Sequence, residues 1–405
     1  MKVCFETFGC RLNKAEALEM EAAYLAKGWA RTERHAEADL FVVRGCSVTA
    51  RAQRDCERLI DHLKRRYPRT PLRVCGCLPQ KSRALAQPAA APRTADEATP
   101  VPTRTARAYL KVQDGCSGRC TFCLVPKFRG ASASVPFGAV LDKARRFVDA
   151  GYRELVVTGC NLALYASEGK RLPDLVAALA DVSADCRVRL GSLEPGACAL
   201  ETVRAMAERA NVCRFLHVPV QSGSNRILAA MKRPYLVRDV EALVATATKL
   251  LPNLGLGCDV MTGFPDESDF DFAATEGLLR RLPFNHAHVF PYSERPGTLA
   301  AAFGGALPKA VRTARAHRLA EQVARSRELF ARRFLGREVE VVVEDEKQTS
   351  GWTGEYLRCT TVSPAPRKAC VRIFVTRVHA DATLEGRLVG RGTDPTSSTS
   401  KQTSP

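Results

Sequence analysis

Apolar and polar positions follow two alternating patterns through most of the chain. In the first eighty residues, three short apolar runs each end at a glycine–cysteine pair, and the stretches between them carry apolar residues three and four positions apart. The predicted strands are 2–8, 39–43 and 71–75, and the predicted helices are 14–27 and 49–66. This alternation predicts an amino-terminal α/β domain.

The middle of the chain continues the alternation over a longer segment. The predicted strands are 108–112, 154–158, 188–190, 215–218, 257–261 and 286–290, and the predicted helices are 137–150, 172–179, 200–210, 239–251 and 269–281. Six strand–helix units predict a central partial TIM-type (β/α)6 barrel. In such barrels the active-site residues lie at the carboxyl ends of the strands.

The last quarter of the chain changes character. A long helix is predicted over 309–333, and four strands follow at 338–343, 356–362, 369–378 and 383–389, which together favour a small antiparallel β-barrel of the oligonucleotide-binding (OB) kind. The predicted domains are 1–83, 108–300 and 335–392, with an exposed linker at 84–107, a basic helix at 301–334 and a disordered tail at 393–405.

Charge and composition limit the partners and the compartment. The 405 residues include 61 Lys and Arg against 43 Asp and Glu, which gives a net charge of +18. This balance favours a polyanionic partner such as nucleic acid, with a merely soluble basic surface as the alternative. No apolar run approaches the roughly 20 residues that span a bilayer, and the chain starts without an apolar signal core. We therefore expect no membrane partner, a cytoplasmic location and free thiols at most of the sixteen cysteines.

The most specific motif is C-x3-C-x2-C at Cys116, Cys120 and Cys123. Thiolates favour iron–sulfur clusters or zinc, and structural zinc sites usually use two C-x2-C pairs that close the coordination shell. Three thiols from one loop would leave one iron of a four-iron cluster open to a small ligand. Chance clustering in a cysteine-rich chain is the alternative.

A second set of three thiols follows the three predicted strand ends of the amino-terminal domain, at Cys10, Cys46 and Cys77. Ligands bind beyond the carboxyl ends of parallel strands in α/β sheets. A glycine before each thiol would let the backbone approach a bulky ligand. The sequence therefore predicts a second three-thiol site, and three buried structural cysteines are the alternative.

These motifs resemble those of a known family. The cysteine loop, with Phe122 before its last thiol, resembles the signature of radical S-adenosylmethionine (SAM) enzymes, although that position is usually Tyr. The segments 7–13 (TFGCRLN), 45–49 (GCSVT) and 76–80 (GCLPQ) resemble the methylthiotransferases, and FGCRLN favours the branch that acts on N6-threonylcarbamoyladenosine in tRNA. The resemblance covers roughly residues 1 to 392. It departs at Arg44-Gly45, where the family usually has Asn-Thr.

The resemblance implies the cofactors and their sites. Two [4Fe-4S] clusters are expected, one on Cys116, Cys120 and Cys123 that binds SAM, and one auxiliary cluster on Cys10, Cys46 and Cys77. The candidate SAM-binding residues are Phe122, Thr158, Gly159, Glu194, Gln221 and Ser222. Glu194 would accept ribose hydroxyls, with a helix cap or a salt bridge as the alternative. Cys160, His217, His286 and His288 are interpreted as structural residues.

The resemblance also implies a reaction and its partners. The expected reaction is methylthiolation of C2 of N6-threonylcarbamoyladenosine 3′ to the anticodon, with SAM as both methyl donor and radical source. The expected partners are the tRNA anticodon stem-loop and an electron donor such as flavodoxin or ferredoxin. Isopentenyl-adenosine in tRNA and a ribosomal-protein aspartate are alternative substrates. An RNA-binding protein with a vestigial metal site is the alternative from a different class.

Three features near the carboxyl terminus are candidates for RNA contact. Segments 351–356 (GWTGEY) and 388–391 (LVGR) resemble a TRAM domain, a small RNA-binding barrel. Trp352 and Tyr356 could stack on bases or be packed inside the protein. Arg312, Arg315 and Arg318 share a helix face that suits either phosphate binding or plain solvation.

Overall fold

The computed structural model describes residues 1–79, 106–344, 347, 349–366 and 368–389. Almost all of the predicted linker at 84–107, the whole predicted tail at 393–405 and the end of the 388–391 motif lie outside the described residues. Within the part that is described, no helix is both long enough and apolar enough to cross a membrane.

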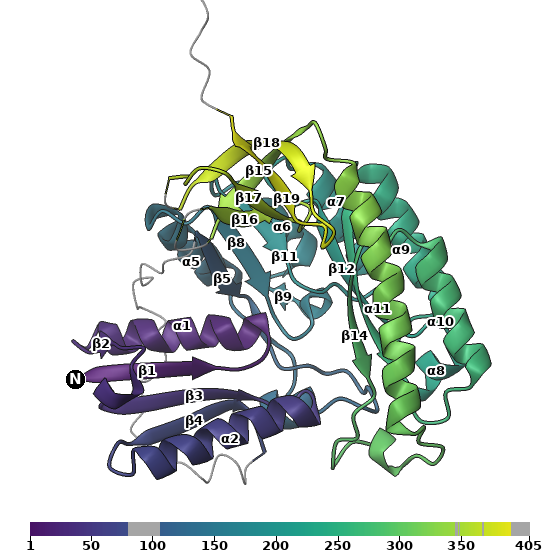
Figure 1. The fold of residues 1–405 in the computed structure, drawn as a ribbon, viewed down its shortest axis with the longest axis horizontal. Helices are drawn as coiled ribbons and strands as arrows, with labels where there is room; N and C mark the ends of the chain where they lie inside the picture. The colour runs from purple at the N-terminus through teal and green to yellow at the C-terminus, as the bar shows by residue number, and fades with distance from the viewer. Residues whose placement is uncertain (80–105, 345–346, 348, 367, 390–405) are drawn as a thin grey trace, which may run out of the picture.

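The amino-terminal residues form a four-stranded parallel sheet in the order β2-β1-β3-β4, with α1 and α2 beside it (Figure 1). The bounds are β1 Lys2–Thr7, α1 Arg11–Leu25, β2 Ala30–Arg31, β3 Leu40–Cys46, α2 Ala50–Arg66 and β4 Leu72–Cys77. Helix α2 begins where the Thr49 hydroxyl accepts a hydrogen bond from the Ala52 amide at 3.1 Å. The predicted α/β domain is confirmed; the two-residue edge strand β2 was missed because it is too short to show a pattern.

The central residues form two three-stranded parallel sheets, β11-β8-β5 and β12-β13-β14. Their strands are β5 Arg107–Lys111, β8 Glu154–Thr158, β11 Arg187–Leu190, β12 Phe215–Gln221, β13 Gly255–Thr262 and β14 His286–Pro291. Two isolated parallel bridges, Val188 to Val212 and Ser192 to His217, connect the sheets. Six parallel strands confirm the predicted partial barrel.

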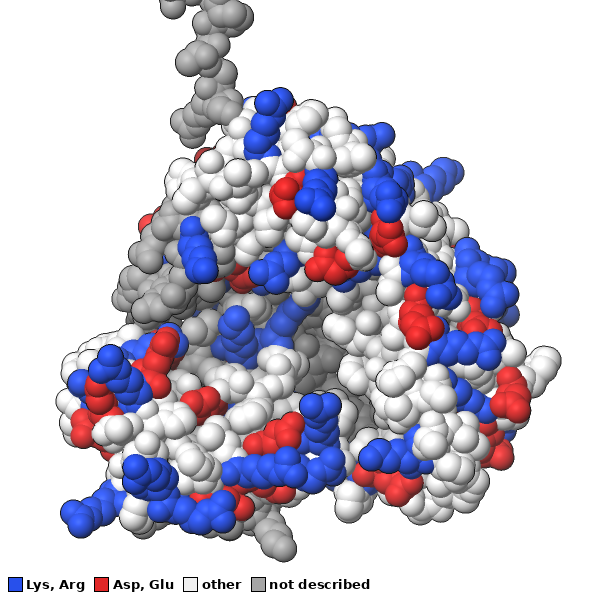
Figure 2. All heavy atoms as spheres, in the orientation of Figure 1, with Lys and Arg blue, Asp and Glu red and all other residues white. Residues whose placement is uncertain are grey.

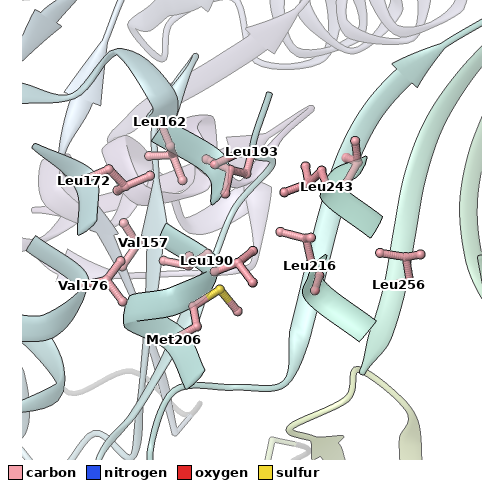
Figure 3. Close-up of a cluster of buried hydrophobic side chains, with 14 of the residues drawn as sticks. Val157, Leu162, Leu172, Val176, Leu190, Leu193, Met206, Leu216, Leu243 and Leu256 are labelled. Carbon is pink, nitrogen blue, oxygen red and sulfur yellow. The ribbon is translucent and has the colours of Figure 1, made fainter. Parts of the chain in front are cut away.

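Helices cover the outside of these strands, because one face of each strand is apolar. They are α5 Phe137–Asp149, α6 Leu172–Ala180, α7 Ala197–Ala207, α9 Val237–Leu250 and α10 Asp269–Arg281. Leu190 and Leu216 point from the strands toward helix residues such as Val176 and Leu243, as Figure 3 shows. All four side chains are fully buried or nearly so, and this layer forms the main hydrophobic core.

Several short elements follow the strands of the central barrel. They are β6 Gln113–Asp114, α4 Val125–Arg129, β7 Ala133–Ser134, η2 Leu162–Leu164, β9 Ala166–Ser167, β10 Lys170–Arg171, α8 Asn225–Ala230 and η3 Ala300–Ala302. One more, η1 His35–Glu37, lies between β2 and β3 of the amino-terminal sheet. The loop between β6 and α4 carries the C-x3-C-x2-C motif.

The carboxy-terminal residues form helix α11, Lys309–Arg332, and a closed barrel in the order β15-β16-β17-β19-β18. The strands are β15 Glu338–Val343, β16 Ser350–Thr353, β17 Arg358–Thr361, β18 Cys370–Val378 and β19 Leu384–Leu388. The predicted small barrel is confirmed. Strand β16 was missed because its Ser-Gly-Trp-Thr sequence carries no alternation long enough to separate it from a turn.

The small barrel packs against the amino-terminal ends of the central strands. Glu154, at the start of β8, is fully buried and receives hydrogen bonds from Arg187 at 2.6 Å and from Arg189 at 2.7 Å. Arg189 also donates to the carbonyl of Thr353 on β16 at 2.7 Å. One buried carboxylate therefore organises the arginines that attach the small barrel to the central one.

The same interface decides between the two alternatives that the sequence left open for Tyr356. The Tyr356 ring lies between Phe215 of β12, with centroids 4.6 Å apart, and Trp352, with centroids 4.7 Å apart. Both ring faces are occupied by protein, so Tyr356 is a packed aromatic rather than a free platform for bases.

The arginines of α11 are also engaged with protein. Arg315 is buried and donates to Glu267 at 2.5 Å, Arg318 donates to Glu276 at 2.7 Å, and Arg312 donates to the Tyr292 carbonyl at 2.7 Å. These bonds attach α11 to the central barrel. Phosphate binding by these residues stays a prediction, and of the three only Arg318 is largely exposed, at 63%.

Candidate active site

The fold brings the three early cysteines to one place. Cys46 and Cys77 are register partners at the ends of β3 and β4, and Cys10 immediately precedes α1. A Cβ atom on Gly9, next to Cys10, would lie 2.7 Å from the Cys46 sulfur. Burial raises the pKa of the Cys46 thiol, and the neighbouring charges of Cys10 and Cys77 raise it further.

Glycine is required before these cysteines for two different reasons. Gly9 and Gly76 have φ angles of +95° and +93°, a region that favours glycine. Gly45 has no such angle, but a Cβ atom there would lie 2.1 Å from a Leu78 methyl group. The expected role of Gly45 in approaching a ligand is therefore corrected: its small size makes room for Leu78.

The second set of thiols lies in the loop before α4. The Gly118 amide points at the Cys116 sulfur at 3.3 Å, and the Val125 amide points at the Cys123 sulfur at 3.4 Å. Burial raises the pKa of the Cys123 thiol to about 11. Arg233 donates to the Cys120 sulfur at 2.9 Å. Amide and guanidinium donors of this kind stabilise thiolates that bind a metal cluster.

The chemistry of both thiol sets suits an iron–sulfur cluster. Each set supplies three free cysteines, and thiolates are the ligands that iron–sulfur clusters take from proteins. Among the described residues, neither set has its three sulfurs within 4.8 Å of one another, as the ligands of a single ion would lie. The donor sets therefore fit the cofactors that the motifs imply.

A cavity of about 690 Å³ opens beside the second thiol set. Its walls come from the cysteine loop and from the carboxyl ends of β8, β11, β12 and β13, as expected for a barrel of this kind. Glu194 lies in the wall, accepts a hydrogen bond from Asn161 at 2.7 Å and pairs with Arg233. The salt-bridge alternative for Glu194 is therefore present, and the carboxylate still faces the cavity.

The other predicted SAM residues divide into two groups. Phe122 and Gln221 line the cavity, and Gln221 has a φ of +62°, a strained conformation that occurs at functional sites. Thr158, Gly159 and Ser222 do not line it: Thr158 and Ser222 are buried, and a Cβ atom on Gly159 would meet the Gln113 side chain at 2.8 Å. At the end of β8 the lining residues are the next two, Cys160 and Asn161.

A second cavity of about 280 Å³ adjoins the first and reaches Cys77 of the early thiol set. The two cavities share Phe122, Cys123, Val125, Gln221 and Asp259 in their walls. The far wall of the second cavity contains Cys77 together with the 47–49 segment that follows Cys46. The second thiol set and Cys77 of the early set therefore line two adjoining cavities.

Arg129 joins one thiol of the early set, Cys77, to the strand that leads into the cysteine loop, and sequence reasoning missed this role. Its side chain is buried and donates to the Cys77 sulfur at 2.9 Å, to Asp114 at 2.8 Å and to Glu16 of α1 at 2.9 Å. Nothing in the local sequence marks Arg129, because its partners are more than fifty residues away in Cys77 and Glu16.

Replacement of Arg129 by Met is expected to destabilise the protein by about 2–4 kcal/mol, because Glu16 and Asp114 would lose their shared buried cation. Denaturant unfolding of the metal-free protein measures the effect. Arg145→Met is the matched control: its pair with Asp142 is exposed and is expected to contribute less than about 1 kcal/mol. Equal effects of the two substitutions would contradict this interpretation.

Sequence reasoning also missed a polar group in the cavity floor. His217 and His288 lie 3.0 Å and 3.1 Å from the same oxygen of Asp259, which lines both cavities. Cys160 also lines the larger cavity, so its interpretation as a core residue is corrected; burial raises the pKa of its thiol to about 12. The only local signal for this group was strand periodicity, which places His286 and His288 on the same face of their strand.

Comparison with known proteins identifies the family. A model of the radical SAM superfamily matches residues 110–279, and one described as uncharacterized protein family UPF0004 matches residues 2–92. The structure of the radical SAM methyltransferase TsrM from Kitasatospora setae aligns with this chain with a TM-score of 0.53 and 14% sequence identity. The alignment covers 74% of this chain and 77% of TsrM, and it supports the fold.

Two relatives extend the likeness along the chain. A tRNA-2-methylthio-N(6)-dimethylallyladenosine synthase of Chlorobium limicola is 31% identical, over 86% of this chain and 88% of the relative. The threonylcarbamoyladenosine tRNA methylthiotransferase MtaB of Aquifex aeolicus is 28% identical, over 86% of this chain and 94% of the relative. Membership of this group implies SAM and [4Fe-4S] clusters as cofactors. With these matches and two thiol sets around adjoining cavities, the chain belongs to the radical SAM methylthiotransferases.

Proposed function

We propose that this protein methylthiolates C2 of N6-threonylcarbamoyladenosine, 3′ to the anticodon in tRNA. The names of both relatives support a tRNA substrate, and one of them names threonylcarbamoyladenosine. The C2–H bond of adenine is not activated, so acid–base side chains cannot remove its hydrogen; bound SAM and the two clusters would supply the radical and the sulfur. The six cysteines Cys10, Cys46, Cys77, Cys116, Cys120 and Cys123 are the proposed cluster ligands.

The observation that carries the choice of substrate is Arg295. Its side chain lines the smaller cavity, next to the early thiol set, and is only 7% exposed. Its Nε has no hydrogen-bond partner among the described residues, and one Nη donates to Gln53, which is uncharged. Burial lowers the pKa of this guanidinium, and the nearby Glu57 offsets that effect only in part, so the threonyl carboxylate of the substrate would be a favourable second partner.

The remaining cavity residues suit the handling of SAM and adenosine. Glu194 and Asn161 offer polar groups for ribose, and Phe122 packs edge-on to the buried Phe264 and provides an apolar wall. The adenosine lies in a single-stranded loop, so it can leave its stack at little cost. Gln221 stands between the two cavities, where it can contact both SAM and the base. A one-electron donor such as flavodoxin or ferredoxin completes the proposal.

Isopentenyl-adenosine in tRNA is the second candidate, favoured by the composition of the smaller cavity. Most of its wall is apolar, and includes Val48, Leu124, Phe128 and Met261. An isopentenyl group would fill such a space without any charged partner. In that case Arg295 would have no ligand role, which distinguishes the two candidates.

Nucleoside analysis of tRNA tests the proposal. In cells that lack this protein and have no redundant enzyme, 2-methylthio-N6-threonylcarbamoyladenosine is expected to disappear while its unthiolated precursor accumulates. Complementation with the wild-type chain restores it, and complementation with Arg295→Met is expected to restore far less. Mass spectrometry of digested tRNA measures both nucleosides. Loss of the 2-methylthio-isopentenyl nucleoside instead would support the second candidate, and no change in either nucleoside would overturn the proposal.

A further inference from the structure

Strand β14 presents a row of rings on one face. His286, His288 and Phe290 are two residues apart and therefore point to the same side, while Ala287 and Val289 pack on the opposite side against the main core. That opposite side faces α11, whose Leu319 and Val323 belong to the same core. The row thus faces the interior of the partial barrel.

These rings are more exposed than a core role requires. The His288 side chain is 51% exposed and Phe290 is 36% exposed, although both lie on a central barrel strand. Figure 2 shows the surface hollowed where α1, the small barrel and β14 meet in Figure 1. A partly exposed row of rings beside a hollow marks an interaction surface.

The row runs from the small barrel to the active-site cavity. The His286 ring centroid lies 5.3 Å from that of Tyr356, and 4.9 Å from that of His288. His288 lies 6.1 Å from Phe290, which lines the smaller cavity. From His286 to Phe290 the strand extends roughly 13 Å, a length suited to two or three unstacked nucleotides.

Hydrogen bonds fix the imidazole rings in place. An Arg327 guanidinium nitrogen lies 2.9 Å from His286 Nδ1; the guanidinium can only donate, so Nδ1 accepts and Nε2 carries the hydrogen. That Nε2 donates to His288 Nε2 at 3.2 Å, and His288 Nδ1 then donates to Asp259 at 3.1 Å. This chain leaves His286 uncharged, so its ring offers a stacking surface rather than a cation.

Positive charge lies beside the row. Arg327 contacts His286, and its buried Nε has no hydrogen-bond partner among the described residues. Arg11 of α1 donates to the Tyr356 hydroxyl at 2.9 Å on the other side of the small-barrel aromatics. Aromatic faces interleaved with guanidinium groups are characteristic of surfaces that bind single-stranded nucleic acid.

We propose that His286, His288 and Phe290 form the surface on which the unpaired loop nucleotides next to the modified adenosine stack. This inference rests on the proposed tRNA substrate, and names where the loop is held. These rings take the place of Tyr356 as the expected site for base stacking, because the Tyr356 ring already stacks on Phe215 and Trp352. The stem would remain outside the hollow, since only splayed bases can reach rings inside the barrel.

Binding of RNA to the reconstituted full-length protein tests the inference. The probes are an unmodified anticodon stem-loop and a duplex with the same stem but no loop, and fluorescence anisotropy gives Kd for each. The double variant His288→Ala, Phe290→Ala is expected to raise Kd for the stem-loop about tenfold or more and to leave Kd for the duplex unchanged. Phe270→Ala, on an exposed phenylalanine of α10, is the control and is expected to change neither.

The ring-preserving variant His288→Phe, Phe290→Tyr separates stacking from a loss of fold. It is expected to bind the stem-loop within about threefold of wild type. An unchanged Kd in the double alanine variant, or equal weakening for stem-loop and duplex, would overturn the inference. Because these probes lack any N6 group, binding is independent of which modified adenosine is the substrate. A failure of the proposed function would appear only in the tRNA nucleoside analysis.

Discussion

Replacement of both Cys46 and Cys77 by alanine is expected to abolish methylthiolation completely while SAM cleavage remains measurable. The two sulfurs lie at the ends of adjacent strands, so their loss leaves only Cys10 of the early thiol set. One thiolate cannot hold a [4Fe-4S] cluster. The other three cysteines come from a separate loop and would still bind their cluster and SAM.

The measurement is iron and sulfide content after anaerobic reconstitution, followed by two assays on the same sample. Iron is expected to fall from about eight to about four per chain. Release of 5′-deoxyadenosine after chemical reduction is expected to persist, and methylthiolated nucleoside is expected to be absent. Cys198→Ala, on a half-buried cysteine of α7, is the matched control and should retain both clusters.

The reciprocal variant makes the result specific. Cys120→Ala removes a thiol that receives a hydrogen bond from Arg233, and is expected to abolish both SAM cleavage and methylthiolation. If the double alanine variant kept about eight irons, or still inserted sulfur, the early cysteines would be structural and the proposed division of labour between the two thiol sets would be wrong.

Substitution of Glu154 by Gln is expected to give the largest loss of stability of any single charge change. Glu154 is fully buried and is the shared partner of Arg187 and Arg189, with Arg107 also 3.8 Å away. Removal of the carboxylate charge leaves the buried guanidinium groups without their anionic partner, and this typically lowers the free energy of unfolding by about 3–5 kcal/mol. Part of the loss comes from the interface, because Arg189 also holds the Thr353 carbonyl of the small barrel.

Denaturant unfolding of the metal-free chain measures this effect. Glu201→Gln is the control, since its pair with Arg171 is exposed and is expected to contribute less than about 1 kcal/mol. Burial by itself would raise the pKa of Glu154, but the arginines outweigh it and hold the pKa well below the usual carboxyl range. The stabilisation is therefore present above the pKa of an unfolded glutamate and is lost only in strong acid. A change below 1 kcal/mol in Glu154→Gln would contradict the assignment.

Local patterns were sufficient for most of the fold. The alternating apolar runs located the six barrel strands, because each strand buries one face against helices that are themselves amphipathic. The cysteine loop was recognised by its resemblance to the radical SAM signature, which is a local motif because its three thiols lie within eight residues of one another. Strands β2 and β16 were missed because two to four residues cannot display a period.

Predictions that assigned a side chain to one partner were less reliable. Arg315 and Tyr356 were candidates for RNA contact. Arg315 is buried in a pair with Glu267, and the half-buried Tyr356 ring stacks on Phe215 and Trp352. A sequence shows that a residue is basic or aromatic, but it does not show which residue distant in the chain pairs with that side chain or packs against it. Thr158 and Gly159 illustrate the same limit at a strand end, where the lining residues are the next two along the chain.

The amino-acid sequence by itself determined the order of the strands and helices and, through motifs that resemble a known family, the family. The cysteine loop depends on residue type and short-range spacing, whereas Cys10, Cys46 and Cys77 were grouped by their positions at predicted strand ends. Only the tertiary structure decided that Arg129 joins Cys77 to Glu16 and Asp114, and that Glu154 gathers the arginines beneath the small barrel. The structure also revealed the ring row on β14 as a surface. The physical reason is that long side chains choose partners by burial and charge across segments distant in sequence, and chain order does not encode that choice locally.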